Sequence, residues 1–193
     1  MTLHTTLVLD TSVSMRPIFE PLVDDVLIPV VHELQRKATA GCVFRFGLYT
    51  FPDGGCLLPD GDAAQLCAML NRLTLSGGAP DGRECLLPAL TDAIDRLPHA
   101  DPDALHALLV VSDAPAFSDA IQDMLSFVVP DSLLQITLLH HPEFTQRLRP
   151  RSGPGQFADI SLASYALGDA LRAQVPEIAR KLSDAVLISS NVT

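Results

Sequence analysis

The chain has 193 residues, of which 48% are hydrophobic, so it can bury a core as one folded domain over residues 1–193. This composition excludes an intrinsically disordered chain. The formal net charge of -10 argues against nucleic acids and anionic membrane surfaces as partners, because both would repel the protein.

We expect no leader sequence and no membrane span. Asp10 interrupts the early apolar run that a signal peptide would need, and no apolar run is long enough to cross a bilayer. The cysteines are widely spaced and form no CxxC pair, which favours reduced thiols over zinc or redox chemistry. They are Cys42, Cys56, Cys67 and Cys85. These features predict a cytoplasmic protein.

Strand-like apolar runs alternate with helical spacings along the chain. The strand patterns lie at residues 5–9, 42–51, 107–113, 133–141 and 158–164, and the helical patterns at 20–38, 63–73, 84–97, 118–127 and 175–187. Pro29 predicts a kink in the first helix, and the turn-rich residues 52–62 predict a connection without regular structure. Such alternation predicts an α/β fold: a Rossmann-like, doubly wound, mostly parallel sheet with helices on both faces.

Two of the predicted strands end in an acid, Asp10 and Asp113, and ligands in such folds bind beyond the carboxyl ends of the strands. Two neighbouring carboxylates repel each other unless a cation or a shared proton offsets the repulsion. Ser12 and Ser14 follow Asp10 in a DxSxS pattern, and their hydroxyls suit a hard cation such as Mg²⁺. The alternative is that each acid caps a helix and each serine is a loop residue.

The segment TLVLDTSVSM resembles the opening of a von Willebrand factor A domain, whose metal-ion-dependent adhesion site begins with DxSxS. The segment ALLVVSDAPAF resembles the fourth strand of that family, which carries the distal acid, here Asp113. The resemblance, to the bacterial stand-alone type, implies a Mg²⁺ site, with Mn²⁺ or Ca²⁺ as alternatives. Ser12 and Ser14 would bind directly, while Asp10 and Asp113 would act mainly through water. It also implies a non-enzymatic interaction module whose metal binds an Asp or Glu of a protein partner.

The loop GGAPDGRE departs from the common family pattern. Many A domains supply a threonine to the metal from a loop resembling GGTxT, and Ala79 stands where that threonine would fall. The loop resembles a variant of integrin β subunits and many bacterial A domains, which implies Glu84 as the third ligand and Asp81 as a further candidate. Arg83 replaces the usual proline and adds a positive charge that would lower metal affinity. Glu84 is equally explained as a helix-start acid favoured by the macrodipole.

Two other functions stay open. A degenerate A domain would bind its partner without metal, given Ala79 and Arg83. A metal-dependent phosphatase of the haloacid dehalogenase type also begins with an acid after its first strand, but it needs a second Asp where this chain has Ser12. Such an enzyme also needs a lysine at the crevice, whereas Lys37 and Lys181 lie in predicted helices. We therefore expect no enzymatic activity.

The remaining polar candidates lie late in the chain. His140 and His141 end a predicted strand and would point to opposite faces, which disfavours joint metal binding. Three arginines, at 147, 149 and 151, could capture a phosphate or an acidic partner, or form a solvated loop. No sequence feature identifies the partner or the oligomeric state.

Overall fold

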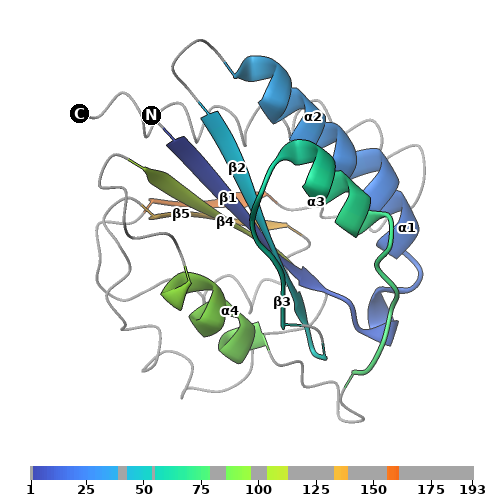
Figure 1. Ribbon diagram of the computed structural model, residues 1–193. Coiled ribbons are helices and arrows are strands. Elements are labelled where there is room, and N and C mark those ends of the chain that lie inside the picture. The colour runs from blue at the N-terminus through green and yellow to red at the C-terminus, as the bar shows by residue number, and fades with distance from the viewer. Residues whose placement is uncertain are drawn as a thin grey trace.

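The computed structural model describes residues 2–38, 43–53, 55–78, 86–96, 104–112, 133–138 and 156–160. These residues build a six-stranded sheet with the order β3-β2-β1-β4-β5-β6 (Figure 1). The strands are β1 (Thr2–Asp10), β2 (Val43–Phe51), β3 (Gly55–Gly61), β4 (Leu105–Val111), β5 (Leu133–Leu138) and β6 (Gln156–Ile160). Neighbouring strands are parallel except β2 and β3, which are antiparallel. The predicted mostly parallel sheet is confirmed.

The strand order reverses between β1 and β4. From β1 the chain proceeds outward to β2 and β3, and it then returns to β4 on the other side of β1. This order is doubly wound, and such folds bind ligands beyond the carboxyl ends of the strands at which the order reverses, here β1 and β4. Residues 5–10 of β1 and 106–111 of β4 are all buried. Burial on both faces explains why residues 7–9 and 107–111 read as continuous apolar runs.

A helical run without a break extends from Phe19 to Lys37. It consists of α1 (Phe19–Leu22), the π-helical segment η2 (Val23–Leu27) and α2 (Ile28–Lys37). Pro29 explains the wider turn before it, because proline has no N–H for the carbonyl four residues back and its ring crowds that carbonyl. The helix predicted at 20–38 is confirmed, and its irregularity takes the form of this π-helical turn.

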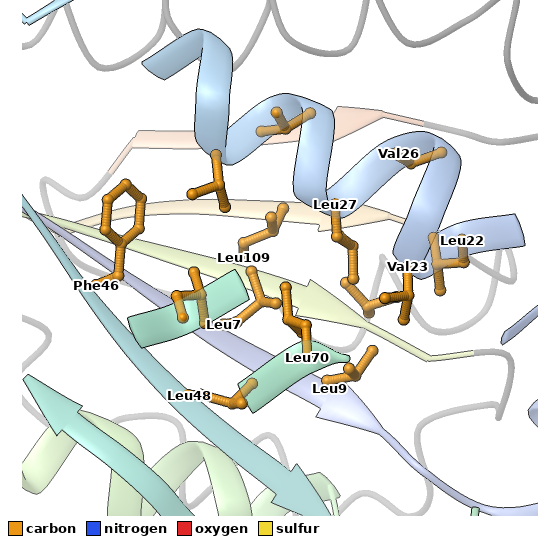
Figure 2. Packing of buried hydrophobic residues seen from close by; sticks show 14 of the residues in the cluster. Leu7, Leu9, Leu22, Val23, Val26, Leu27, Phe46, Leu48, Leu70 and Leu109 are labelled. Carbon is orange, nitrogen blue, oxygen red and sulfur yellow. The ribbon is translucent and has the colours of Figure 1, made fainter. Parts of the chain in front are cut away.

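The helical run and α3 (Ala63–Leu70) cover one face of the sheet and enclose the main hydrophobic cluster of the described residues (Figure 2). Alternate residues of β1, such as Leu7 and Leu9, enter this cluster because side chains alternate between the faces of a strand. Leu22 and Val26 enter it from the helical run, at the spacing of one helical face. This packing holds the carboxyl end of β1 in place.

The opposite face of the sheet is covered by α4 (Leu86–Asp95), which contacts β1 and β2 (Figure 1). Leu90 and Ala93 of α4 are buried. Helices therefore lie on both faces, which confirms the predicted doubly wound α/β architecture. Within the described ranges, no helix has the length and hydropathy that crossing a bilayer requires.

The prediction of an irregular connection at residues 52–62 is wrong, because β3 occupies Gly55–Gly61. Its glycines and Pro59 resemble turn residues, but an outermost strand tolerates them since one side of its backbone needs no partner. β1 also begins earlier than predicted, at Thr2, and so does β6, at Gln156.

Two of the cysteines lie in the described part, and both have free thiols. Cys56 and Cys67 are half-buried. Cys67 packs against the main hydrophobic cluster, and burial raises the pKa of its thiol. Several predicted features lie outside the described residues: the helices at 118–127 and 175–187, Cys42, Cys85, His140, His141 and the arginines at 147, 149 and 151.

Candidate functional site

Asp10 is the last residue of β1, and its side chain is fully buried. Its Oδ1 accepts a hydrogen bond from the backbone N–H of Ser12 at 2.8 Å, and its Oδ2 accepts one from the Ser112 hydroxyl at 2.6 Å. Ser112 directly follows β4, so this carboxylate joins the two strands at the reversal point. A buried carboxylate requires such donors, because an unsatisfied charge would be costly away from water.

The two serines of the DxSxS motif converge. Ser12 and Ser14 bring their Oγ atoms to 2.8 Å from each other. Ser12 is fully buried, whereas Ser14 is exposed, so one hydroxyl lies inside the loop and the other faces solvent. The 3-10 turn η1 (Val13–Met15) begins here, with Ser12 rather than Asp10 at its N-cap. Asp10 therefore does not cap η1; it closes a tight turn onto the Ser12 N–H.

Thr11 joins this loop to two other segments. Its N–H and its hydroxyl both donate to the carbonyl of Phe51 at the end of β2, at 2.8 and 2.9 Å. Its own carbonyl accepts the N–H of Ser76 at 2.9 Å. Thr11 is buried, so the bond from its hydroxyl to Phe51 is shielded from water, whereas Ser76 lies at the surface. The segment at 73–78, which leads from α3 towards the predicted third ligand loop, is thereby bonded to the DxSxS loop.

Asp53 and Gly77 form a second contact at this edge of the sheet. Gly77 has a φ of +67°, a conformation that favours glycine. A Cβ atom on Gly77 would come to 2.6 Å from Cγ of Asp53, so the Asp53 carboxyl group occupies the space of a side chain at position 77. Only glycine fits there while Asp53 keeps its place.

Three of the six predicted metal-site residues are described, and the structure brings them together: Asp10, Ser12 and Ser14. Asp113, Glu84 and Asp81 lie outside the described residues, as do Ala79 and Arg83. No group of three or more His, Cys, Asp or Glu side chains within the described ranges is placed to hold a metal ion. The described part of the site thus offers one carboxylate and two converging hydroxyls.

Sequence reasoning missed four residues of this arrangement: Thr11, Asp53, Ser76 and Ser112. A signal existed for Ser112, because it precedes the acid that marks the end of a predicted strand. Val111 of β4 pairs with Leu9 of β1. The next residues along these two parallel strands, Ser112 and Asp10, therefore lie side by side. Thr11 and Ser76 bond mainly through backbone atoms, which leave no signature in side-chain pattern.

Comparison of the chain with known proteins gives a fold and no sequence family. No family model matches the sequence, and no curated protein matches it. The structure is similar to BatB, a conserved hypothetical protein from Bacteroides thetaiotaomicron, with a TM-score of 0.64 and 11% identity over 97% of this chain and 99% of that one.

Two further solved structures are similar. The SpRpn10 VWA domain matches with a TM-score of 0.61 and 14% identity, over 92% of this chain and 95% of that one. A von Willebrand factor type A structure from Catenulispora acidiphila matches with a TM-score of 0.52 and 18% identity, over 98% of this chain and 42% of that one. The chain therefore has the von Willebrand factor A fold, as the DxSxS resemblance implied.

Proposed function

We propose that this protein is a non-enzymatic interaction module that holds a divalent cation beside Ser12 and Ser14 and uses it to bind an Asp or Glu side chain of a protein partner. Mg²⁺ is the proposed cation, with Mn²⁺ or Ca²⁺ as alternatives. The observation that carries the proposal is the convergence of two serine hydroxyls directly after a buried carboxylate. A fold alone does not decide function, so the proposal rests on this site.

The donor set fits a hard cation. Oxygens in adjacent positions of a Mg²⁺ octahedron lie about 3.0 Å apart when each bond is about 2.1 Å long. The Oγ atoms of Ser12 and Ser14 are 2.8 Å apart, so they would fill two adjacent positions with little movement. Both hydroxyls are neutral, and a cation held by neutral ligands keeps the charge that attracts a partner carboxylate.

Asp10 would serve the site mainly by orientation. Both of its oxygens already accept internal hydrogen bonds, and one of these bonds fixes the backbone N–H of Ser12. A carboxylate held in this way orients the residues that bind the metal and acts on the cation through water. We propose Asp113 as a second acid of this kind and Glu84 as the third ligand, with Asp81 nearby.

The exposed side of the loop suits a protein partner. Ser14 faces solvent, and Val13, which lies between the two serines, is 45% exposed. When bound, the cation would supply a coordination position for a carboxylate oxygen. Val13 would supply an apolar contact beside it. A partner of this kind presents an acidic residue next to an apolar one.

Two observations bear on the alternatives. The full burial of Asp10 and the two hydrogen bonds to its oxygens do not suit a nucleophile, which supports a non-enzymatic role over a phosphatase-like one. The second candidate is a degenerate site that binds its partner without metal. It is favoured by Ala79 and Arg83 in the loop GGAPDGRE.

Thermal unfolding in EDTA and in Mg²⁺ or Mn²⁺ tests the proposal. A cation at about 100 times its Kd should raise the Tm of the native protein by about 5–10 °C, because it binds only the folded state. Ser14→Ala and Asp10→Ala should abolish this rise. Thr2→Ala, which removes a hydroxyl at the opposite end of β1, should keep it. No rise in the native protein at millimolar cation would favour the degenerate site.

The partner half of the proposal needs a separate measurement. Peptides that carry an exposed Asp or Glu should be retained by the immobilised protein in Mg²⁺ and released by EDTA. The same peptides with Asn or Gln in place of the acid should not be retained. Retention that survives both EDTA and the amide substitution would contradict binding through the cation.

A further inference from the structure

We infer, building on the proposed function, that Thr11 is a positioning residue that sets the cation affinity of the DxSxS loop, and that Gly77 lets the segment at 73–78 approach Thr11. The carbonyl of Thr11 bonds this segment to that loop. Neither residue belongs to the predicted set of metal ligands. The inference concerns how Ser12 is held, and it follows from contacts among described residues.

The peptide group between Thr11 and Ser12 is anchored at both ends. Its N–H, on Ser12, donates to Oδ1 of Asp10 at 2.8 Å. Its C=O, on Thr11, accepts the N–H of Ser76 at 2.9 Å. A peptide group is planar, so a rotation that moves one end must move the other. The bond from Ser76 therefore helps to fix the orientation of the backbone that carries the Ser12 hydroxyl.

Thr11 also ties this peptide group to the sheet. Its N–H and hydroxyl share the carbonyl of Phe51, at 2.8 and 2.9 Å, which holds the residue from the side of β2. The DxSxS loop is thus held by β2 and by the 73–78 segment through one buried residue. Removing either support gives the loop freedom that cation binding would have to take away again.

Gly77, the residue after Ser76, has no room for a side chain while the Asp53 carboxyl group stays where it is. The Asp53 carboxyl group lies where a side chain on residue 77 would be, so the 73–78 segment can approach only with glycine at this position. A methyl group there must push the segment or Asp53 aside. Displacing the segment would break the bond from Ser76 to Thr11, because the two residues 76 and 77 are adjacent.

Gly77→Ala and Gly55→Ala form a matched pair that tests this inference. Both glycines have positive φ, +67° and +81°, so both variants carry backbone strain. A Cβ on Gly55 meets nothing within 4 Å, whereas a Cβ on Gly77 meets Asp53. By isothermal titration with Mn²⁺, Gly77→Ala should weaken binding about tenfold or more, as changes behind metal ligands commonly do. Gly55→Ala should leave the affinity within about twofold.

A double variant separates the contact from general damage. In the Asp53→Ala background the obstructing carboxyl group is gone, so Gly77→Ala should weaken Mn²⁺ binding no more than Gly55→Ala does there. This non-additivity is the signature of a direct contact. If Gly77→Ala alone does not fold, Thr11→Val and Thr11→Ser replace it. The valine variant, which lacks the hydroxyl, should bind Mn²⁺ more weakly, and the serine variant should restore the affinity.

Denaturant unfolding in EDTA provides the second readout, because a merely structural role would lower stability without changing cation affinity. Equal Mn²⁺ affinities for Gly77→Ala and Gly55→Ala, or for Thr11→Val and Thr11→Ser, would overturn the inference. If Asp10→Ala and Ser14→Ala still abolish binding in that case, the proposed function stands. A native protein that binds no Mn²⁺ would overturn both.

Discussion

Ser112 donates a 2.6 Å hydrogen bond to Asp10, although 102 positions separate the two residues in the sequence. Both side chains are buried, and they meet because β1 and β4 are parallel neighbours whose carboxyl ends coincide. The bond links the ends of β1 and β4, where the strand order reverses, through a buried hydrogen bond to a carboxylate. Hydrogen bonds to a charged group are stronger than those between neutral groups.

Ser112→Ala should lower the free energy of unfolding by about 1–3 kcal/mol, because it leaves one oxygen of a buried carboxylate without its donor. Urea unfolding in EDTA measures the change without any contribution from a cation. Ser14→Ala removes a hydroxyl from an exposed residue of the same site and should cost less, about 0.5 kcal/mol. Equal losses of unfolding free energy in the two variants would show that the bond to Asp10 contributes no more to stability than an exposed hydroxyl does.

Asp62→Ala should destabilise the protein by about 1 kcal/mol through the start of α3. Asp62 accepts the N–H of Gln65 at 2.8 Å, and the Gln65 side chain accepts the N–H of Asp62 at 2.9 Å. The substitution leaves the first turn of the helix without its cap. Asp95→Ala, at the exposed carboxyl end of α4, is the control and should cost nothing, since an acid there opposes the helix dipole. Denaturant titration of both variants compares them directly.

Asp60 makes part of the stability depend on pH. Its carboxylate accepts two hydrogen bonds from Arg45, at 2.9 and 2.7 Å. These bonds, together with the charge of Arg45, lower the pKa of Asp60. A carboxyl group with a lower pKa in the folded state stabilises the fold above its unfolded pKa of about 3.9. The contribution is lost as the pH falls through the folded value.

The comparison of the native protein with Asp60→Asn shows this effect. At pH 7 the native protein should be more stable by about 1 kcal/mol or less, because Asp60 is 46% exposed and solvent screens the pair. The difference should shrink as the pH falls below about 4 and vanish once Asp60 is protonated in the folded state. Unfolding curves at a series of pH values measure it. A difference that stays constant down to pH 2 would mean that the pair does not titrate in this way.

The sequence predicted the central strands and the first helix well, because their patterns reflect burial. β1 and β4 are covered on both faces and contain unbroken apolar runs at residues 7–9 and 107–111, and Asp10 could be placed at a strand end from that pattern alone. β3 was missed because Pro59 and three glycines at 54, 55 and 61 resemble a turn, whereas tertiary pairing with β2 makes this stretch a strand. Local composition carries little information about such pairing.

The candidate site likewise contains residues that the sequence identified and residues that it did not. The residues Asp10, Ser12 and Ser14 are close in sequence, so spacing was enough to group them. Thr11 bonds to segments that are more than twenty positions away, through backbone carbonyls, and the carboxyl group of Asp53 lies where a side chain on Gly77 would be. Such contacts depend on strand register and on φ angles, and the identity of a single residue determines neither.

Pro59 bears on how the protein behaves when it is concentrated. β3 is the outermost strand on its side of the described sheet, and a long regular strand in that position pairs readily with a strand of another molecule. Pro59 removes one backbone N–H, the register shifts on either side of Leu48 interrupt the ladder, and Asp60 with Arg45 adds charge. This edge is therefore a poor template for a foreign strand, and it protects the protein from aggregation by sheet extension.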